Sequence, residues 1–446
     1  MRRFALMLLA GAPSLVAAQG FGVYEHNTCA MGRAGVTAAG PCADGSAIFF
    51  NPAGLGALGG NRFSVGTTLI GAQGGFTDDF LGRRTDLNNP LIPVPSAYFT
   101  HALSPTLTAG IGVYAPYGLE TKWPTDFEGR FIGYNTKIRS IYIQPTLGVQ
   151  VSPKLKLGVG VAYITSRLEL HQRADLSRQF ALPGVPFAAL GIPSGTDFAD
   201  ASLAATGTGY AVNFGGIFQV SDRVSIGGHW LTRKKIDYDG TVDFTKIPTG
   251  LTLAPGNPLG VPGGTPVDAL VAGQFNAGGP LASGGVKTSI IMPPQGTLGF
   301  AYRASDTWTV MADYHYVVWG WFSQIVIDFA NPATPDLTLR PSNKDTHGVR
   351  VGTEYQYSPK IQLRAGYLYH TGASPPQFVT PLLPEGARNE FTIGAGIALT
   401  DKLHADLGYQ YIKQNDRRGT VDLSAGNTGL YKFSAHLFGI GAAYTF

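Results

Sequence analysis

The sequence predicts an all-β protein, a 14-stranded antiparallel transmembrane β-barrel with a small N-terminal α-helical hatch that plugs the lumen. Three observations support this prediction. Short hydrophilic turns recur along the chain, the segments beside them alternate apolar and polar residues, and long segments separate one pair of strands from the next. Short turns on one side and long loops on the other are typical of outer-membrane barrels, whose apolar residues face lipid and whose polar residues face the lumen.

The composition argues against several other classes of protein. Only 14% of the 446 residues are charged, and no charged or Ser-rich linker divides the chain into separate domains. After the first residues, every apolar stretch ends well before the roughly 20 residues that a membrane helix needs. The net charge of +4 is small and dispersed, so we expect no nucleic-acid partner.

The N-terminus has the three regions of a secretory signal peptide. Arg2 and Arg3 precede the apolar run FALMLLAGAPSLV, and small residues follow it. We predict cleavage after Ala18, which makes residues 1–18 the signal peptide and lowers the net charge from +4 to +2.

The chain contains two cysteines, Cys29 and Cys42. In an exported protein they could form a disulfide. Two small buried residues are an equally good interpretation, because the spacing alone does not define their geometry.

Six hydrophilic turns share one pattern, a Ser or Thr followed by Pro or Asp. Proline presets φ for a turn, and Ser and Asp side chains bond the local backbone, so each site predicts a tight hairpin. The six turns are LSPTLT (103–108), VSPKLK (151–156), VSDRVS (220–225), ASDTWT (304–309), YSPKIQ (357–362) and LTDKLH (399–404).

The segments beside these turns have the period of two that is expected of strands. In 361–369, the residues Ile361, Leu363, Ala365, Tyr367 and Tyr369 share one face, and polar residues take the other; 349–357 and 403–411 alternate in the same way. We place fourteen strands in the barrel, residues 62–446, near 62, 96, 107, 138, 155, 209, 224, 288, 307, 347, 361, 390, 403 and 432. We expect a monomer in contact with outer-membrane lipid.

The last strand ends the chain on the aromatic residue Phe446. Such an ending resembles the assembly signal of bacterial outer-membrane proteins. It predicts recognition by the barrel assembly machinery.

Residues 19–61 precede the first strand and are rich in Gly, Ala and small polar residues. A barrel of fourteen strands is wide enough to leave a lumen, which leaks unless something fills it. Within the segment FFNPAGLGAL (49–58), Pro52 pushes Asn51 out of the α region, so a short apolar helix is expected to end there. We interpret 19–61 as the hatch.

The N-terminal block carries a resemblance to a known family. The mature start QGFGVYEHNTCAMGRAG, the run that ends in Asn51, Pro52 and Ala53, and the distal YGL at 117–119 resemble the FadL family of outer-membrane transporters for long-chain fatty acids and hydrocarbons. The strand and turn order is similar along the whole chain, but the specific motifs lie in this block.

The resemblance implies a fourteen-stranded barrel, an N-terminal hatch, and a kinked third strand that opens the wall sideways. An apolar ligand would enter from outside, occupy a luminal pocket and leave into the outer membrane by diffusion. Residues 107–119 are expected to form the third strand. Pro116 and Gly118 lie near its upper end, where a lost ladder bond lets the strand bend.

No enzymatic constellation is present in the sequence. It contains no G-x-S-x-G elbow, H-E-x-x-H pair, C-x-x-C motif or P-loop, and the nine histidines are scattered. We therefore expect no catalytic residues, no metal site and no cofactor. The pairs Gly158/Gly160, Gly394/Gly396 and Gly439/Gly441 lie inside strands and are interpreted as small inward positions.

Several hatch residues are candidates for gating. Phe21 matches the family's Gly-Phe pair, which implies a place in the ligand pocket, with an ordinary plug aromatic as the alternative. Gly32 and Arg33 belong to the Gly-Arg-Ala motif, and Arg33 is expected to pair with Glu25 in the lumen. Asn51 is expected to bond the backbone of the hatch or of the wall.

A fatty acid needs an apolar tunnel and a cationic head-group site, because an unpaired carboxylate is costly to desolvate. Arg167 and Arg173 are candidates for this site, with a rim position facing lipid head groups as the alternative. Trp319, Trp321 and Phe322 predict either a ligand-collecting surface patch or part of an aromatic girdle.

The substrate prediction has alternatives. The family's basic residue soon after this tryptophan has no counterpart, since Val326 and Ile327 occupy the region. Long-chain fatty acids are the first candidate ligand, aromatic or other uncharged hydrocarbons the alternative, and a general diffusion porin the third. The apolar loops 171–208 and 239–287 are expected to fold over the mouth and form an outer ligand groove.

Overall fold

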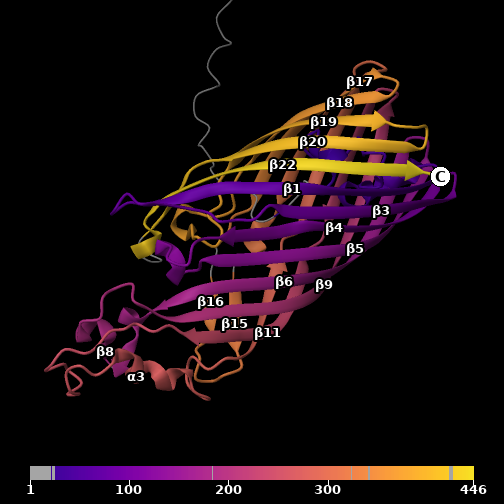
Figure 1. Cartoon of the computed structure of the whole chain (residues 1–446). Helices are drawn as coiled ribbons and strands as arrows, with labels where there is room; N and C mark the ends of the chain where they lie inside the picture. Colours follow the sequence, from indigo (N-terminus) through magenta and orange to yellow (C-terminus); the bar gives the residue numbers. More distant parts are fainter. Residues whose placement is uncertain (1–21, 23–25, 183, 323, 340–341, 421–424) are drawn as a thin grey trace, which may run out of the picture.

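The computed structural model describes residue 22 and residues 26–182, 184–322, 324–339, 342–420 and 425–446 (Figure 1). Fourteen wall strands form a closed antiparallel barrel, as predicted. In chain order they are β1 (Asn61–Asp78), β3 (Ile92–Ser104), β4 (Leu107–Lys122), β5 (Asn135–Ser152), β6 (Leu155–Asp175), β9 (Asp197–Ser221), β10 (Val224–Leu231) continued by β11 (Lys234–Lys246), β12 (Gly284–Met292) continued by β13 (Gln295–Arg303), β14 (Trp308–Val317) followed by β15 (Ile325–Phe329), β17 (Thr346–Ser358), β18 (Ile361–His370), β19 (Arg388–Ala398), β20 (Leu403–Gln414) and β22 (Gly429–Thr445).

The barrel closes between its first and last strands. β1 pairs with β3 on one side and with β22 on the other, from Arg62↔Thr445 to Asp78↔Gly429. The third strand, β4, is three residues longer than predicted. None of the helices among the described residues is long and apolar enough to cross a membrane.

The short hydrophilic motifs form hairpin turns, as predicted. At the turn between β3 and β4, the Ser104 hydroxyl accepts hydrogen bonds from the backbone N–H groups of Thr106 (3.3 Å) and Leu107 (3.1 Å). Ser152 accepts in the same way from Leu155 at 3.1 Å. The local side-chain bonding that the motif predicts therefore fixes these connections.

The alternation along the strands separates the two faces of the wall. On β17, Val349 and Val351 are exposed to the outside, whereas Arg350 between them is 2% exposed and faces the lumen. On β18, Leu363 faces outward and Arg364 inward. The outward face is thus an apolar belt suited to lipid, and the polar residues line the interior.

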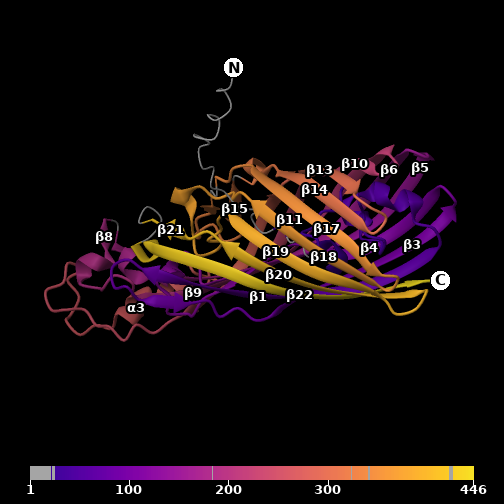
Figure 2. The same cartoon turned by 90° about the horizontal axis from the view of Figure 1, so that it is seen from above.

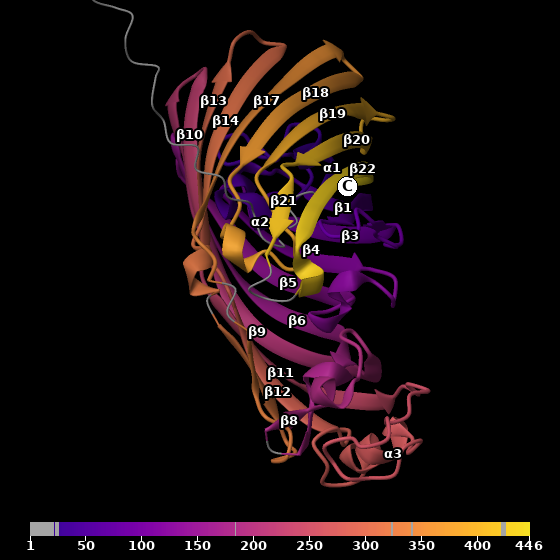
Figure 3. The same ribbon diagram turned by 90° about the vertical axis from the view of Figure 1, so that its left-hand side faces the viewer.

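The hatch, residues 26–60, lies inside the ring of strands (Figure 3). It contains α1 (Thr28–Met31), α2 (Ala47–Phe50) and the 3₁₀ helix η1 (Pro52–Ala57). The hatch packs closely against glycines of the wall. A Cβ atom added at Gly158 would lie 2.2 Å from the Pro52 carbonyl carbon, and one added at Gly439 would lie 2.5 Å from Met31 Cε. These glycines are small inward positions because the hatch backbone approaches the wall there.

Three neighbouring wall strands are interrupted side by side. β10 gives way to β11 at 232–233, β12 to β13 at 293–294, and β14 ends at Val317. The register pairs Leu231↔Gln295 and Gln295↔Val317 bring the three breaks together in the wall.

The end of the barrel opposite the C-terminus, which we call the mouth, carries long connections with β8 (Val185–Pro186) and α3 (Val267–Val271) that project beyond one side of the wall (Figures 1 and 2). The loops there are shorter than predicted, because β6 and β9 stay paired as far as Asp175↔Asp197, and β11 stays paired with β9 as far as Lys246↔Ala199. Segments 176–196 and 247–283 connect these strands. They bury a shared apolar cluster that includes Phe187, Leu190, Leu253, Val267 and Val271.

The remaining elements are short and belong mainly to the connections. They are β2 (Arg84–Asp86), η2 (Glu128–Phe131), η3 (Leu176–Arg178), β7 (Phe180–Leu182), β8 (Val185–Pro186), η4 (Phe187–Leu190), α3 (Val267–Val271), η5 (Ala272–Phe275), η6 (Trp319–Trp321), β16 (Leu337–Leu339), η7 (Pro376–Phe378), β21 (Arg417–Gly419) and η8 (Ala425–Asn427).

Candidate transport pathway

A gap in the hydrogen-bonded wall separates the outer halves of β3 and β4. The pairing of these strands runs from Ser104↔Leu107 to Ala97↔Val113 and goes no further among the described residues. Beyond that point β3 still pairs with β1 as far as Ile92↔Ile70, and β4 with β5 as far as Lys122↔Asn135. The two strands therefore continue side by side without a shared ladder.

A β-bulge in β4 begins where the ladder to β3 ends. Tyr114 pairs with Tyr142 and Tyr117 with Ser140, so Ala115 and Pro116 together oppose Ile141. A bulge bends its strand and increases the local twist, and proline removes a donor from the ladder. Gly118 lies just beyond the bulge.

The gap opens onto a lateral cavity of about 490 Å³. Its lining is mainly apolar and comes from residues 92–95 of β3 and from residues 113–115 and 117–121 of β4, with Ile138, Leu383 and Ile412 behind them. Gly22 also lines the cavity and forms an isolated antiparallel bridge with Tyr117. Gly22 thus contacts the bulged strand at the cavity.

A large cluster of buried apolar side chains lies inside the barrel, and we call it the interior cluster. It contains hatch residues and wall residues, including Ile48, Phe49, Phe50, Tyr114, Tyr117, Ile138, Tyr142, Ile164, Leu203, Ile236, Val242, Trp319, Phe322 and Ile327. Tyr117 and Ile138 also line the lateral cavity, while Leu203, Val242 and Ile327 line a second pocket at the mouth. The cluster is therefore a continuous apolar connection between the two.

The mouth pocket has a volume of about 320 Å³ and contains Arg173 in its lining. The Arg173 guanidinium lies 3.7 Å from an Asp200 carboxylate oxygen and 5.6 Å from the centroid of the Tyr134 ring. The Tyr134 hydroxyl donates to Asp200 at 3.0 Å. Burial, and then the charge of Asp200, raise the pKa of Tyr134 to about 12, which keeps this hydroxyl protonated.

Asn51 ties the hatch to itself and to the wall. Its side-chain carbonyl accepts from Ala53 N–H at 3.1 Å and caps η1, and its amide donates to the carbonyls of Ala38 (2.6 Å) and Gly216 (3.2 Å). Pro52 occupies the first position of η1, where its missing N–H costs nothing. The Asn-Pro-Ala motif therefore ends α2 and docks the turn that follows it against β9.

Two wall amides hold the preceding helix. Asn213 donates to the carbonyls of Ile48 (3.2 Å) and Phe49 (2.6 Å), and Gln144 donates to Ile48 at 2.5 Å. These groups satisfy the free carbonyl end of α2, which is fully buried.

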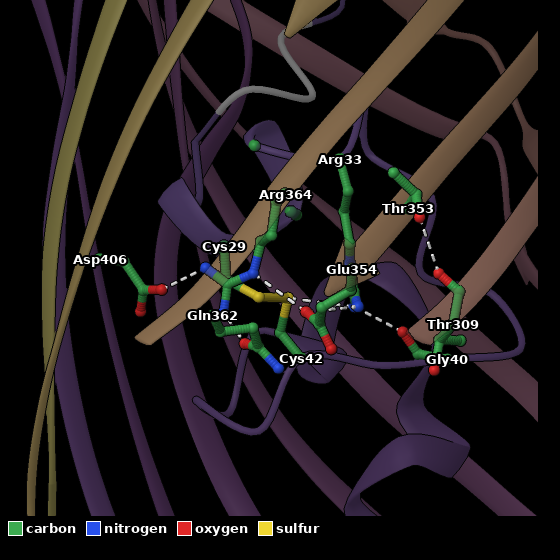
Figure 4. Close-up of polar contacts among 12 residues, drawn as sticks. Cys29, Arg33, Gly40, Cys42, Thr309, Thr353, Glu354, Gln362, Arg364 and Asp406 are labelled. Atoms are coloured by element: carbon green, nitrogen blue, oxygen red, sulfur yellow. Dashed lines mark hydrogen bonds and ion pairs between the residues drawn. A yellow bond between two sulfur atoms is a disulfide. The ribbon is translucent and has the colours of Figure 1, made fainter. Parts of the chain in front are cut away.

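A charged cluster anchors the hatch near the end of the barrel that carries the short turns (Figure 4). Arg33 Nη1 lies 3.4 Å from Glu354, and Arg364 Nε lies 3.0 Å from the same carboxylate oxygen. Arg364 also pairs with Asp406. Cations and carboxylates thus alternate, as buried charges require.

Cys29 and Cys42 form a disulfide beside this cluster, with their Cα atoms 6.3 Å apart. Arg33 Nη2 lies 3.2 Å from the Cys42 sulfur. Potential ligand atoms of both cysteines and of Asp44 lie within 4.8 Å of one another, but the disulfide uses both sulfurs, so we assign no metal here. Gly32 packs against β19, where its Cβ would lie 3.1 Å from Gly394 Cα.

The aromatic and basic candidates divide between the inside and the outside. Trp319 and Phe322 are buried in the interior cluster, so the surface-patch interpretation is wrong for them. Trp321 is exposed, and Arg233 stacks over its ring at 4.8 Å. The Arg167 side chain is 62% exposed on the outer face and pairs with Glu169 at 2.7 Å, in line with the alternation along β6.

Two candidates, Phe21 and Glu25, lie outside the described residues. The predicted partner of Arg33 therefore has no described position, and the described partner is Glu354. The segment 1–18 also lies outside them, and cleavage after Ala18 stays a prediction.

Sequence reasoning missed the gap on the β3 side and the buried wall polar groups. The signal for the gap was available in Pro93 and Pro95, which cannot donate to a ladder and share the same side of β3. Asn213, Gln144 and Lys234 occupy inward positions, but their partners are far away in sequence, so alternation alone could not assign them a role.

A closed barrel with an internal hatch, an apolar interior and a lateral cavity defines a transport protein of the bacterial outer membrane. The family model described as "Outer membrane protein transport protein (OMPP1/FadL/TodX)" matches residues 9–446, so the chain belongs to this family. It is a transporter of hydrophobic compounds and not an enzyme.

Full-length relatives and solved structures agree with this assignment. The chain is 23% identical to "Outer membrane protein P1" of Haemophilus influenzae, covering all of both chains, and 22% identical to the "Long-chain fatty acid transport protein" of Escherichia coli O6:H1, covering 99% of each. The structure is similar to a Pseudomonas aeruginosa FadL homologue (TM-score 0.80, 18% identity, 96% of this chain and 100% of that one). It is also similar to the P. putida toluene transporter TodX (TM-score 0.71, 17% identity, 96% and 99%).

Proposed function

We propose that this protein takes up long-chain fatty acids by passive diffusion from the mouth pocket, through the barrel interior, to the lateral cavity and from there into the outer membrane. The observation that carries the proposal is the interior cluster, whose members line the lateral cavity at one end and the mouth pocket at the other. An acyl chain gains about 0.8 kcal/mol for each methylene that it buries in such surroundings.

The lateral exit is supported by the missing ladder between β3 and β4. Strand edges without partners occur in a membrane wall only where they face protein or a cavity, since unpaired backbone groups are costly in lipid. Here the unpaired edges face the lateral cavity. The hatch fills the direct route along the barrel axis, which favours a sideways exit and disfavours a general diffusion porin.

Uncharged hydrocarbons are the alternative ligands, and one observation favours them. The arginines that line the lateral cavity already have carboxylate partners: Arg139 lies 3.3 Å from Glu120, and Arg388 lies 2.7 Å from Glu390. A cation that is already paired gains less from a ligand carboxylate. Relatives of both kinds exist, since one is named for long-chain fatty acids and one solved structure for toluene.

Deleting Ala115 tests the lateral route. The deletion leaves one β4 residue opposite Ile141, which removes the bulge and lets β4 run straight beside β3. We expect uptake of labelled oleate by cells to fall by about tenfold or more, equivalent to about 1.4 kcal/mol or more. Heat-modifiable migration on gels would show that the barrel still assembles.

The matched control deletes Tyr357, which lies at the register shift between β17 and β18 next to a short turn. Its removal perturbs a hairpin far from the gap in sequence and should leave uptake within about twofold of the wild type. Equal uptake by both deletion variants and the wild type would contradict a lateral exit.

The outer groove is a second part of the proposal. Segments 176–196 and 247–283 share an apolar cluster beside the mouth, and we propose that they collect ligand for the mouth pocket. Replacing 181–196 with a Gly/Ser linker should lower the uptake rate at low oleate concentration. Unchanged uptake would remove these loops from the pathway.

The C-terminal aromatic residue is proposed as the contact for the barrel assembly machinery. The Phe446 ring is 53% exposed beside Tyr444, with the two ring centroids 5.9 Å apart. Removing Phe446 should reduce the amount of folded protein in the outer membrane without changing transport per molecule. We also propose that the protein acts as a monomer in contact with outer-membrane lipid.

A further inference from the structure

Lys234 is a buried lysine at the break between β10 and β11. The side chain is 1% exposed, and its ammonium donates to the Tyr117 hydroxyl at 3.0 Å and to the Pro293 carbonyl at 2.8 Å. It also lies 4.6 Å from the centroid of the Tyr117 ring. Among the described residues, no carboxylate lies within ion-pair distance of it.

Three other buried basic residues of the barrel have carboxylate partners. Arg33 and Arg364 share Glu354, and Arg388 has Glu390 at 2.7 Å. Taking an ammonium out of water costs several kcal/mol, and two neutral acceptors with one aromatic face recover only part of that cost. An ammonium has three donors, and the two hydrogen bonds account for two of them.

The surroundings of Lys234 suit a hydrocarbon chain. Leu231 and Ile236 flank it in sequence, and Met292 is its register partner on β12; all three are buried members of the interior cluster. An anion at this position would therefore have a cation at one end and apolar side chains around it.

The position also borders the proposed pathway, which it meets through Tyr117. Tyr117 follows the β4 bulge and lines the lateral cavity, whereas Lys234 and Pro293 belong to the interrupted part of the wall. The bond between Lys234 and Tyr117 thus joins the bulged strand to that interrupted wall. The Tyr117 hydroxyl has its own acceptor, Gln295 Oε1, at 3.1 Å.

We propose that Lys234 and Tyr117 form the carboxylate-binding site for an acyl ligand, an inference that rests on the proposed uptake of fatty acids. One carboxylate oxygen accepts the remaining donor of the Lys234 ammonium. The other carboxylate oxygen accepts a hydrogen bond from the Tyr117 hydroxyl, which then no longer donates to Gln295. The acyl chain lies among the apolar side chains of the interior cluster, and the site selects acids over neutral ligands of the same length.

The test compares two ligands and two variants. Purified protein in a non-ionic detergent is titrated with oleate and with oleyl alcohol, which has the same chain and no charge. Lys234→Met removes the ammonium and keeps the length of the side chain. Because a hydrogen bond to a charged group contributes about 1.5–3 kcal/mol, we expect oleate to bind more weakly by about tenfold to one hundredfold and oleyl alcohol to change by less than about twofold.

The control variant is Lys287→Met, which removes an exposed lysine on β12 whose side chain is 74% exposed and whose partner is Asp239. It should leave the affinity for both ligands unchanged. Tyr117→Phe gives a second variant that keeps the ring and removes the hydroxyl. It should weaken the binding of oleate by about fivefold and leave the binding of oleyl alcohol unchanged. If Lys234→Met does not fold, this variant tests the site instead.

The outcomes separate this inference from the proposed function. A wild-type protein that binds neither ligand would overturn the proposed function and the site together. A wild type that binds both ligands, with Lys234→Met unchanged toward oleate, would overturn the site alone. An equal loss of both ligands in Lys234→Met would also overturn it, because it would show that Lys234 supports the lumen and does not recognise charge.

Discussion

The buried basic groups at the two ends of the barrel interior differ in their partners. Near the short turns, Arg33, Glu354, Arg364 and Asp406 form a chain of alternating charges that locks the hatch to β17, β18 and β20. Toward the bulge in β4, apolar side chains surround neutral polar groups such as Gln295, and Lys234 has only neutral acceptors. The first arrangement pairs buried charges with one another, and the second places an amine among apolar side chains. We expect the hatch end to contribute mainly to stability and, under the proposed function, the bulge end to bind ligand.

Breaking the charged cluster should have the largest effect. Glu354→Ala leaves Arg33 without the carboxylate at 3.4 Å and Arg364 without the one at 3.0 Å. Removing one partner of a buried ion pair costs about 3–5 kcal/mol, so thermal unfolding in detergent should shift to a clearly lower temperature. Circular dichroism would measure the shift, and limited proteolysis would report release of the hatch.

The control for this variant is Glu169→Ala. Glu169 pairs with Arg167, whose side chain is 62% exposed, and such surface pairs contribute about 0–1 kcal/mol. Similar decreases in the unfolding temperature of both variants would contradict the idea that buried charges stabilise the hatch end.

Opening the hatch at its motif should have an intermediate effect. Asn51→Ala removes the cap on Ala53 N–H and leaves the Ala38 and Gly216 carbonyls without this donor. Each unsatisfied buried group costs about 1–3 kcal/mol, so the hatch should loosen while the barrel stays assembled. Planar-bilayer recordings should then show intermittent ion currents that the wild type lacks.

Asn61→Ala provides the matched control, because Asn61 bonds only the exposed His101 among the described side chains, at 2.6 Å. It should show no added current. If Asn51→Ala fails to assemble, the motif serves folding and not gating.

The mouth pocket should give the smallest effect. Arg173→Ala removes a cation that Asp200 already partly neutralises at 3.7 Å, so its contribution to capture is limited to about 1 kcal/mol or about fivefold in initial oleate uptake. Arg167→Ala, on the same strand but on the outer face, should leave uptake unchanged. A tenfold or larger decrease in initial oleate uptake by Arg173→Ala would indicate that the head-group site is at the mouth and not at Lys234.

The fold was predictable because its signals are local. Ser104 and Ser152 bond the backbone two and three residues away, and Val349, Arg350 and Val351 alternate along one strand. The N-terminal motif Asn51-Pro52-Ala53 could be recognised for the same reason, since its cap lies within three residues.

The long-range part of the site was not predictable. Arg33 was expected to pair with Glu25, eight residues before it, but the described carboxylate is Glu354, 321 positions away. Trp319 and Phe322 turn into the lumen at η6, where the wall is interrupted, so strand alternation does not apply to them. Arg173 has the same parity as the outward Arg167, yet it lines the mouth pocket because the connections beyond the membrane cover β6 there.

The sequence by itself determined the number of strands, the sides on which the short and long connections lie, the hatch segment and the family, because turns, alternation and the N-terminal motif are written in contiguous residues. Only the tertiary structure decided where the wall opens, which carboxylates the buried arginines meet and that Lys234 meets neutral acceptors. These properties depend on register and on contacts between strands far apart in the chain. The ladder between β3 and β4 ends at Ala97↔Val113, and Lys234 meets Tyr117 at 3.0 Å, only once the barrel has closed.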